Sequence, residues 1–250
     1  MAPHHIWIDC QQQPRLGETF TATLGFGHGF ATQGKADPLR ARTWLVDPTG
    51  TKIALVPQSE AEQTTLRFTP TKPGLYTLLC EYDGRIWSIS RDGRHLRGPR
   101  SEHPGVDIER SVYSYQFAKT MIALGRDHPR PDPLGVELEI VPRLPGRKEL
   151  EVAVLYRGRP LAELPVQAFL YSNSCAQVAR TDTEGAARFA LSEGRWMILA
   201  VHADREGADT GGYDERSFTS ALTLDLARSQ DGCNLSVRSS VAEPLRDPHR

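Results

Sequence analysis

The residues best suited to chemistry in this sequence are histidines near the ends of apolar stripes. The chain has eight histidines, and a neutral imidazole is a good ligand for nickel, cobalt, copper and zinc ions. His4 shares an alternating phase with Ile6 and Ile8, and His28 follows Phe20, Ala22, Leu24 and Phe26 between two glycines. His202 extends the phase of Trp196, Ile198 and Ala200. Polar residues in such positions indicate the rim of a sandwich, where ligand sites form. The pattern also fits three unrelated rim histidines.

The first two predicted strands, residues 5–9 and 19–28, determine which histidines meet. If they pair as antiparallel neighbours, the start of one lies beside the end of the other, and His4 lies near His28. Two imidazoles make a labile site, so a third ligand is needed. We therefore predict one divalent ion bound by His4 and His28 with His5 or His202, the last reaching across a domain interface.

Composition and motifs exclude several classes of function. The formal net charge is −1, and the chain has no long basic block, which argues against nucleic-acid binding. It has no apolar run of about 20 residues, so direct membrane insertion is not expected. The sequence also lacks the nucleophile elbow, the phosphate-binding loop, the dinucleotide fingerprint and the zinc-protease helix motif. We expect a protein that is not an enzyme.

The strand pattern predicts an all-β protein made of two antiparallel sandwich domains. In the first half, short runs bounded by Gly, Pro, Asp or Asn recur at roughly ten-residue spacing. One predicted turn, Asp83–Gly84, separates residues 74–82 from residues 86–90. Residues 93–110 are predicted to be a solvated loop, and residues 111–124 a closing strand.

Prolines mark the predicted domain boundary. Residues 1–126 form the N-terminal sandwich, and the proline-rich segment 127–134 is a stiff linker. In residues 135–227, a turn at 158–161, a Thr-Asp-x-x-Gly hairpin at 181–185 and a Gly-Arg-Trp strand at 194–196 resemble transthyretin-like and carboxypeptidase-regulatory-like sandwiches. Residues 228–250 are polar and predicted to be a flexible tail.

The four cysteines are Cys10, Cys80, Cys175 and Cys233, and none forms a Cys-x-x-Cys pair. In an exported protein they could form two disulfides, with three possible connectivities. The simplest pairing keeps each bridge within one half of the chain, Cys10–Cys80 and Cys175–Cys233. Four reduced thiols are the alternative.

Several motifs in order resemble a known family. They are His4-His5-Ile6-Trp7-Ile8, Leu16-Gly17-Glu18-Thr19-Phe20, Phe26-Gly27-His28-Gly29-Phe30, Phe117-Ala118-Lys119-Thr120, Gly158-Arg159-Pro160-Leu161, Thr181-Asp182-Thr183-Glu184-Gly185 and Ala200-Val201-His202. This order resembles a periplasmic nickel/cobalt-uptake accessory family, a DUF-type family distantly similar to NikM-like transporter components. His4, His28 and His202 match its histidines, and His5 is additional.

The resemblance implies a periplasmic or extracellular protein whose export signal is replaced here by a start Met. It implies nickel or cobalt handling beside membrane components of a metal importer, either an energy-coupling-factor type importer or a TonB-dependent receptor. One feature departs from nickel-binding N-termini, which use successive backbone amides, because Pro3 has no N–H. The alternative function is a non-catalytic cell-surface sandwich that binds protein or glycan. An exposed aromatic patch that includes Trp7, Trp87 or Trp196 would favour it.

Overall fold

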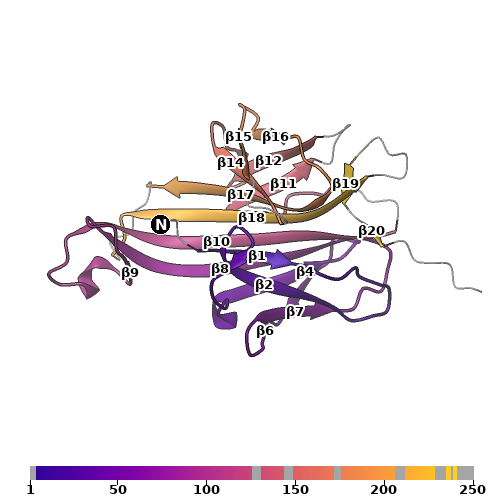
Figure 1. The fold of residues 1–250 in the computed structure, drawn as a ribbon, viewed down its shortest axis with the longest axis horizontal. Helices are drawn as coiled ribbons and strands as arrows, with labels where there is room; N and C mark the ends of the chain where they lie inside the picture. Colours follow the sequence, from indigo (N-terminus) through magenta and orange to yellow (C-terminus); the bar gives the residue numbers. More distant parts are fainter. Residues whose placement is uncertain are drawn as a thin grey trace, which may run out of the picture.

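The chain folds into three layers of β-sheet (Figure 1). The computed structural model describes residues 4–125, 131–143, 149–171, 176–205, 212–228, 235–237 and 239–240. Apart from two short 3-10 helices, η1 (Pro38–Arg40) and η2 (Arg100–Glu102), the regular elements in these ranges are all strands. No helix in the described part of the chain has the length and apolarity that crossing a bilayer requires. The predicted all-β class is confirmed.

The first outer layer is a sheet of N-terminal strands, ordered β1-β2-β7-β6 with β3 beside β2. Its strands are β1 (His5–Asp9), β2 (Phe20–His28), β3 (Ala31–Thr32), β6 (Gln58–Ser59) and β7 (Thr64–Phe68).

The middle layer is an 11-stranded sheet to which both halves of the sequence contribute. From the N-terminal half come β4 (Ala41–Val46), β5 (Lys52–Leu55), β8 (Gly74–Ser90), β9 (His95–Arg97) and β10 (Ile108–Leu124). From the C-terminal half come β14 (Pro165–Leu170), β15 (Ala176–Arg180), β17 (Gly194–Asp204), β18 (Glu215–Arg228), β19 (Leu235–Val237) and β20 (Ser239–Ser240). The last two fall within the range predicted as a tail.

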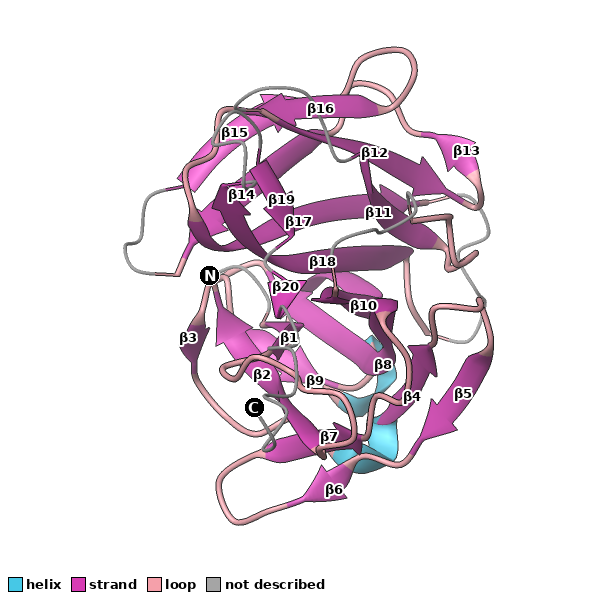
Figure 2. Ribbon diagram, turned by 90° about the vertical axis from the view of Figure 1, so that its right-hand side faces the viewer, coloured by secondary structure: helices cyan, strands magenta, loops and turns pink. Residues whose placement is uncertain are grey.

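The second outer layer is a small sheet of β11 (Leu138–Arg143), β12 (Leu150–Tyr156), β13 (Arg159–Pro160) and β16 (Ala186–Phe189). Figure 2 shows it on the opposite side of the middle sheet from β1, β2 and β7. Side-chain alternation along β10 explains this arrangement, because successive residues face opposite sides of a sheet. Phe117, Met121 and Ala123 join one core with β11 and β12. Ala118 and Ile122 join the other core with β1, β2 and β7.

The two halves meet where β10 pairs with β18. The pairing is parallel and runs from Val112 opposite Glu215 to Thr120 opposite Thr223. The short strand β20 also pairs with β10 in parallel, whereas β8 with β10 and β17 with β18 are antiparallel. Of the predicted linker 127–134, residues 127–130 lie outside the described residues.

Two predictions of local structure are wrong. Asp83–Gly84 is not a turn, because β8 runs through it as one strand paired with β10 along its length. The extra residue is accommodated as a bulge, where the register shifts between Ser114 and Tyr115 and Arg85 has a φ of 61°. The segment 93–110 is not all loop, because it contains β9, η2 and the start of β10.

The predicted Cys10–Cys80 bridge is also wrong, since both thiols are free. Cys80 is fully buried and lies in the core beneath β1 and β2, and Cys10 packs at the edge of that core. Burial raises the pKa of both thiols, that of Cys10 to about 12. Cys175 and Cys233, the other predicted pair, lie outside the described residues.

Candidate functional site

Three of the four predicted ligands gather where β1 begins and β2 ends. The strands are antiparallel, with His5 opposite Gly27 and Ile8 opposite Leu24, as predicted. The ring centroids of His4 and His28 are 4.7 Å apart, and those of His5 and His28 are 5.9 Å apart. We call His4, His5 and His28 the histidine cluster.

The packing of β1 fixes the position of the cluster. All five residues of β1 are buried, with Ile6 and Ile8 in the N-terminal core and Trp7 against Met197, Leu199 and Ala221 of the middle sheet. The Trp7 indole lies across Gly25 so closely that a Cβ there would be 2.0 Å from the ring. Glycine at position 25 therefore lets β1 and β2 pair with the indole between the layers.

The turn from β2 to β3 presents His28. Gly29 has a φ of 57°, in the left-handed region that favours glycine. At Gly27 a Cβ would be 2.1 Å from the Ala31 carbonyl oxygen. The Gln33 amide donates to the Phe26 carbonyl at 2.8 Å and closes the turn. The two glycines beside His28 thus permit a tight reversal that keeps its ring beside β1.

Gln116 of β10 anchors the start of β1 to the middle sheet. Its Oε1 accepts a hydrogen bond from the Ile6 amide at 3.0 Å, and its Nε2 donates to the His4 carbonyl at 3.0 Å. The sequence analysis did not single out this residue. The available signal was a glutamine on the phase of Ala118 and Ile122, which face the N-terminal core.

Burial favours the neutral form of His5 and His28. His5 is only 6% exposed, and desolvation, followed by the nearby His28, lowers the pKa of His5 to about 4. Desolvation and His4 also lower the pKa of His28. Neutral imidazole has a lone pair for a metal ion, whereas the protonated ring has none.

Two ring nitrogens in the cluster have no hydrogen-bond partner among the described residues. They are Nε2 of His5 and Nε2 of His28, and both are buried. The other ring nitrogen of His5 is hydrogen-bonded to the Gly29 backbone. A metal-binding histidine commonly holds one nitrogen in this way and leaves the other for the ion. A buried polar atom without a partner is otherwise costly.

The cluster is not a closed metal centre. Among the described residues, no group of three or more His, Cys, Asp and Glu side chains is arranged to hold a metal ion. The three rings are neighbours, but their nitrogens do not converge on one point. Binding an ion would require one or more rings to rotate, and His4 and His28 are only partly buried.

The structure does not bring His202 to the cluster. Along β17, Trp196, Ile198 and Ala200 face the core shared with β11 and β12, whereas Met197 and Leu199 face Trp7. His202 continues the alternation of Trp196, Ile198 and Ala200. The centroid of its ring lies 4.5 Å from the ring centroid of Tyr156. The alternation that singled it out therefore places it on the opposite face of the middle sheet from β1.

Fold and site together define a three-layer, all-β protein with a buried histidine cluster at one strand end. The chain belongs to the family described as a domain of unknown function, DUF4198, whose model matches residues 1–204. No curated protein matches it.

Three of the solved structures that match this chain do so with low sequence identity and low TM-scores. A tetra-tandem repeat of a large adhesion protein is 11% identical over 90% of this chain and 50% of that chain, with a TM-score of 0.23. This chain thus spans half the length of that structure. A two-domain fibronectin type III segment of chicken tenascin is 11% identical over 88% of this chain and 98% of that chain, with a TM-score of 0.24. A fragment of Escherichia coli alpha-2-macroglobulin is 11% identical over 88% of this chain and 97% of that chain, with a TM-score of 0.23. None of these similarities bears on function.

Proposed function

We propose that this protein is a non-catalytic, extracytoplasmic carrier of a divalent transition-metal ion, bound by His4, His5 and His28. The observation that carries the proposal is the pair of buried, unpartnered Nε2 atoms on His5 and His28. Leaving both without hydrogen bonds costs about 1–3 kcal/mol each, and a shared ion would satisfy both atoms at once.

The setting of each histidine suits a different part of binding. His5 is fixed by its backbone hydrogen bond and by burial, so it supplies a nitrogen of defined position. His28 and His4 are partly exposed and provide a path from solvent. Because His4 and His28 are partly exposed, theirs are the rings that would have to rotate to bring a third nitrogen to the ion.

The donor set favours borderline metals over calcium or magnesium, which prefer oxygen ligands. Nickel and cobalt are the ions we favour, because the motifs that carry His4 and His28 resemble those of nickel/cobalt-uptake accessory proteins. By the same resemblance, we propose that the protein acts in the periplasm or outside the cell. There it would deliver the ion to membrane components of an energy-coupling-factor type importer or to a TonB-dependent receptor.

The competing proposal, a cell-surface module that binds protein or glycan, has less support. It requires an exposed patch of aromatic side chains, but Trp7 and Trp196 are 2% and 3% exposed, and only Trp87 of the three tryptophans is partly exposed. The structural neighbours that come from adhesion and matrix proteins are too dissimilar to favour it.

Metal titration of the full chain tests the proposal. Calorimetry with nickel, cobalt, copper and zinc should give one site per chain, with affinity at least tenfold weaker in His5→Ala and His28→Ala. His95→Ala is the matched control, because His95 is an exposed histidine on β9. His202→Ala should also bind normally. Equal loss in His28→Ala and His95→Ala, or none in either, would contradict the assignment.

A further inference from the structure

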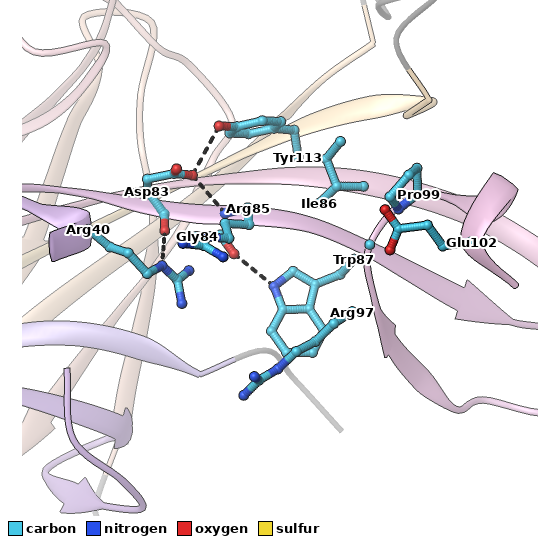
Figure 3. Close-up of a pocket in the computed structure, with 11 residues that line it drawn as sticks. Arg40, Asp83, Gly84, Arg85, Ile86, Trp87, Arg97, Pro99, Glu102 and Tyr113 are labelled. Carbon is cyan, nitrogen blue, oxygen red and sulfur yellow. Dashed lines mark hydrogen bonds between the residues drawn. The ribbon is translucent and has the colours of Figure 1, made fainter. Parts of the chain in front are cut away.

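A second feature of the molecule lies away from the histidine cluster, on the extension of the β8–β10 hairpin. There a groove of about 580 Å³ is lined by side chains of η1, β8, β9, η2 and β10 (Figure 3). Sites for small molecules commonly have volumes of about 300–1,000 Å³. The groove is therefore large enough for a small organic molecule.

Three guanidinium groups line this groove, those of Arg40, Arg85 and Arg97. Most arginines in the described part of the chain form ion pairs with a carboxylate, as Arg42 does with Glu81. Among the arginines whose side chains the structure describes, the exceptions are Arg40, Arg85, Arg97, Arg159 and Arg180. Three of these exceptions thus share one groove with two carboxylates, those of Asp83 and Glu102. The three guanidinium groups outnumber the two carboxylates, so the lining keeps an excess of positive charge.

One of the two carboxylates in the groove, that of Asp83, already accepts two hydrogen bonds. Oδ1 of Asp83 accepts hydrogen bonds from the Arg85 amide at 2.9 Å and from the Tyr113 hydroxyl at 3.0 Å. Arg40 donates from Nε to the Asp83 backbone carbonyl at 2.6 Å, which leaves its terminal nitrogens available. Figure 3 shows these contacts on one wall of the groove. Asp83 therefore shapes the site, and among the described residues it forms no ion pair with the three guanidinium groups.

The backbone at the groove is strained in a way that directs Arg85. Its φ of 61° is unusual for a residue with a side chain. At the preceding position, a Cβ on Gly84 would lie 2.4 Å from the Ser114 hydroxyl oxygen. The bulge interrupts a strand of 17 residues. Bulges and left-handed residues of this kind recur at binding sites because they re-aim a side chain.

An aromatic surface completes the groove. The Trp87 indole donates from Nε1 to the Gly84 carbonyl at 2.9 Å, which fixes the ring. The Arg97 guanidinium carbon lies 5.7 Å from the centre of that ring. Such an arrangement offers an apolar face for carbon atoms beside charged groups for oxygen atoms.

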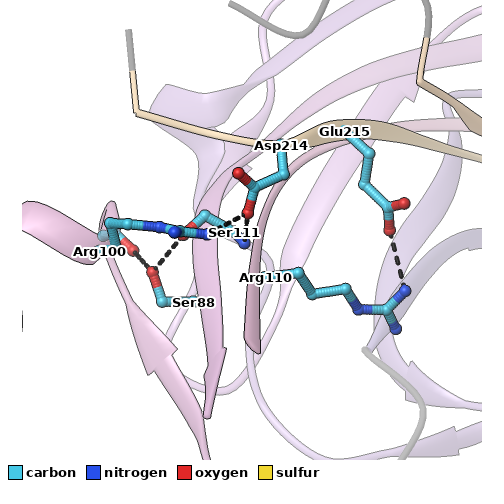
Figure 4. Close-up of polar contacts among 7 residues, drawn as sticks. Ser88, Arg100, Arg110, Ser111, Asp214 and Glu215 are labelled. Carbon is cyan, nitrogen blue, oxygen red and sulfur yellow. Dashed lines mark hydrogen bonds and ion pairs between the residues drawn. The ribbon is translucent and has the colours of Figure 1, made fainter. Parts of the chain in front are cut away.

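The segment that follows Arg97, the last residue of β9, is held in place by hydrogen bonds and an ion pair (Figure 4). The Ser88 hydroxyl donates to the Gly98 carbonyl at 2.8 Å and contacts the Ser111 hydroxyl at 2.9 Å. Arg100 pairs with Asp214, which also accepts the Ser111 amide. The groove is therefore positioned before any ligand arrives, which lowers the entropic cost of binding.

We propose that this groove binds a small organic molecule carrying two or more oxyanion groups, carboxylate or phosphate. A guanidinium fork pairs two parallel N–H groups with either oxyanion. Three such forks exceed what a single monoanion can use, and Trp87 covers the carbon skeleton that joins the anionic groups. The proposal uses none of the histidines, so it stands apart from the proposed metal binding.

Calorimetry on the full, metal-free chain tests the proposal with citrate, pyrophosphate and acetate as probes. Citrate or pyrophosphate should bind at least tenfold more tightly than acetate. Tighter binding of citrate would identify the ligand groups as carboxylates, and tighter binding of pyrophosphate would identify them as phosphates. Arg85→Gln and Arg97→Gln should each weaken that binding at least tenfold, and Arg97→Lys less so. Arg159→Gln, which removes an unpaired arginine elsewhere, should change nothing.

Two results would overturn the proposal. One is that neither citrate nor pyrophosphate binds more tightly than acetate. The other is that Arg159→Gln weakens binding as much as Arg97→Gln, which would indicate a general surface-charge effect. Arg85 and Arg97 are exposed, and an unchanged unfolding midpoint would confirm that the variants fold.

Discussion

Lys119 and Glu139 form an ion pair in the interior, with Nζ and Oε1 2.6 Å apart and side chains only 7% and 2% exposed. Lys119 lies on β10 and Glu139 on β11, so the pair joins the middle sheet to the C-terminal outer sheet. Glu139 also accepts hydrogen bonds from the Leu134 and Gly135 amides. Burial lowers the pKa of Lys119, and Glu139 opposes that effect.

Removing Lys119 should be strongly destabilising. Lys119→Met leaves a buried carboxylate without its cation and should reduce the free energy of unfolding by about 3–5 kcal/mol. Glu139→Leu should cost at least as much, because it also deprives two backbone amides of their acceptor. Urea unfolding measures both. The exposed pair Arg91–Asp107 is the control, and Arg91→Met should cost at most about 1 kcal/mol.

The metal-free protein should lose stability in mild acid through His5. Its pKa is about 4 in the fold and about 6.5 when unfolded, so between these values the unfolded chain binds the extra proton. The stabilising contribution is present above pH 6.5 and is lost as pH falls to 4, by about 3 kcal/mol in total.

Urea unfolding at pH 7 and pH 4.5 measures this contribution. His5→Asn keeps a donor for the Gly29 backbone and has no titrating ring, so its stability should fall less than that of the wild type over this interval. His95→Asn should retain the full loss. An identical pH dependence in wild type and His5→Asn would contradict the assignment.

The positive φ of Arg85 in the bulge should lower the stability of the fold, while the Arg85 side chain contributes to ligand binding. A side chain at positive φ costs about 1 kcal/mol relative to glycine. Arg85→Gly should therefore be more stable than Arg85→Ala by about 1 kcal/mol in urea unfolding. Both variants should lose affinity for the preferred oxyanion probe. Equal stability of the two would show that the backbone relaxes around the substitution.

The thiols of Cys10 and Cys80 should be unreactive until the protein unfolds. Burial raises both pKa values, so little thiolate forms at neutral pH. In a Cys175→Ser, Cys233→Ser variant, a thiol reagent should react with neither thiol in native buffer and with both in denaturant. A count of zero in denaturant without reductant would show that a disulfide does form.

Local patterns in the sequence predicted the strands and the meeting of His4 with His28. Both follow from alternation and from the pairing of sequential strands. The face of the middle sheet on which His202 lies could not be predicted this way. Alternation shows which residues of a strand share a face, but it does not show which outer sheet packs against that face. Asp83–Gly84 has the composition of a turn, and only its partner β10 makes it a bulge.

The guanidinium groove was missed for a similar reason. Its arginines are at positions 40, 85 and 97, and the stretch around Arg97 has the composition of a solvated loop. What unites them is the absence of carboxylate partners among the described residues, which depends on tertiary contacts. Gln116 was missed because its hydrogen bonds reach residues more than 100 positions away.

The parallel pairing of β10 with β18 has a consequence for synthesis. Residues 112–120 leave the ribosome roughly a hundred residues before residues 215–223, their partners in the sheet. During that interval the edge of β10 is an open template that another nascent chain could join. The last quarter of the chain therefore protects the molecule against aggregation. A truncation that removes β18 but keeps the histidine cluster would leave the edge of β10 unpaired and open to strand pairing with another chain.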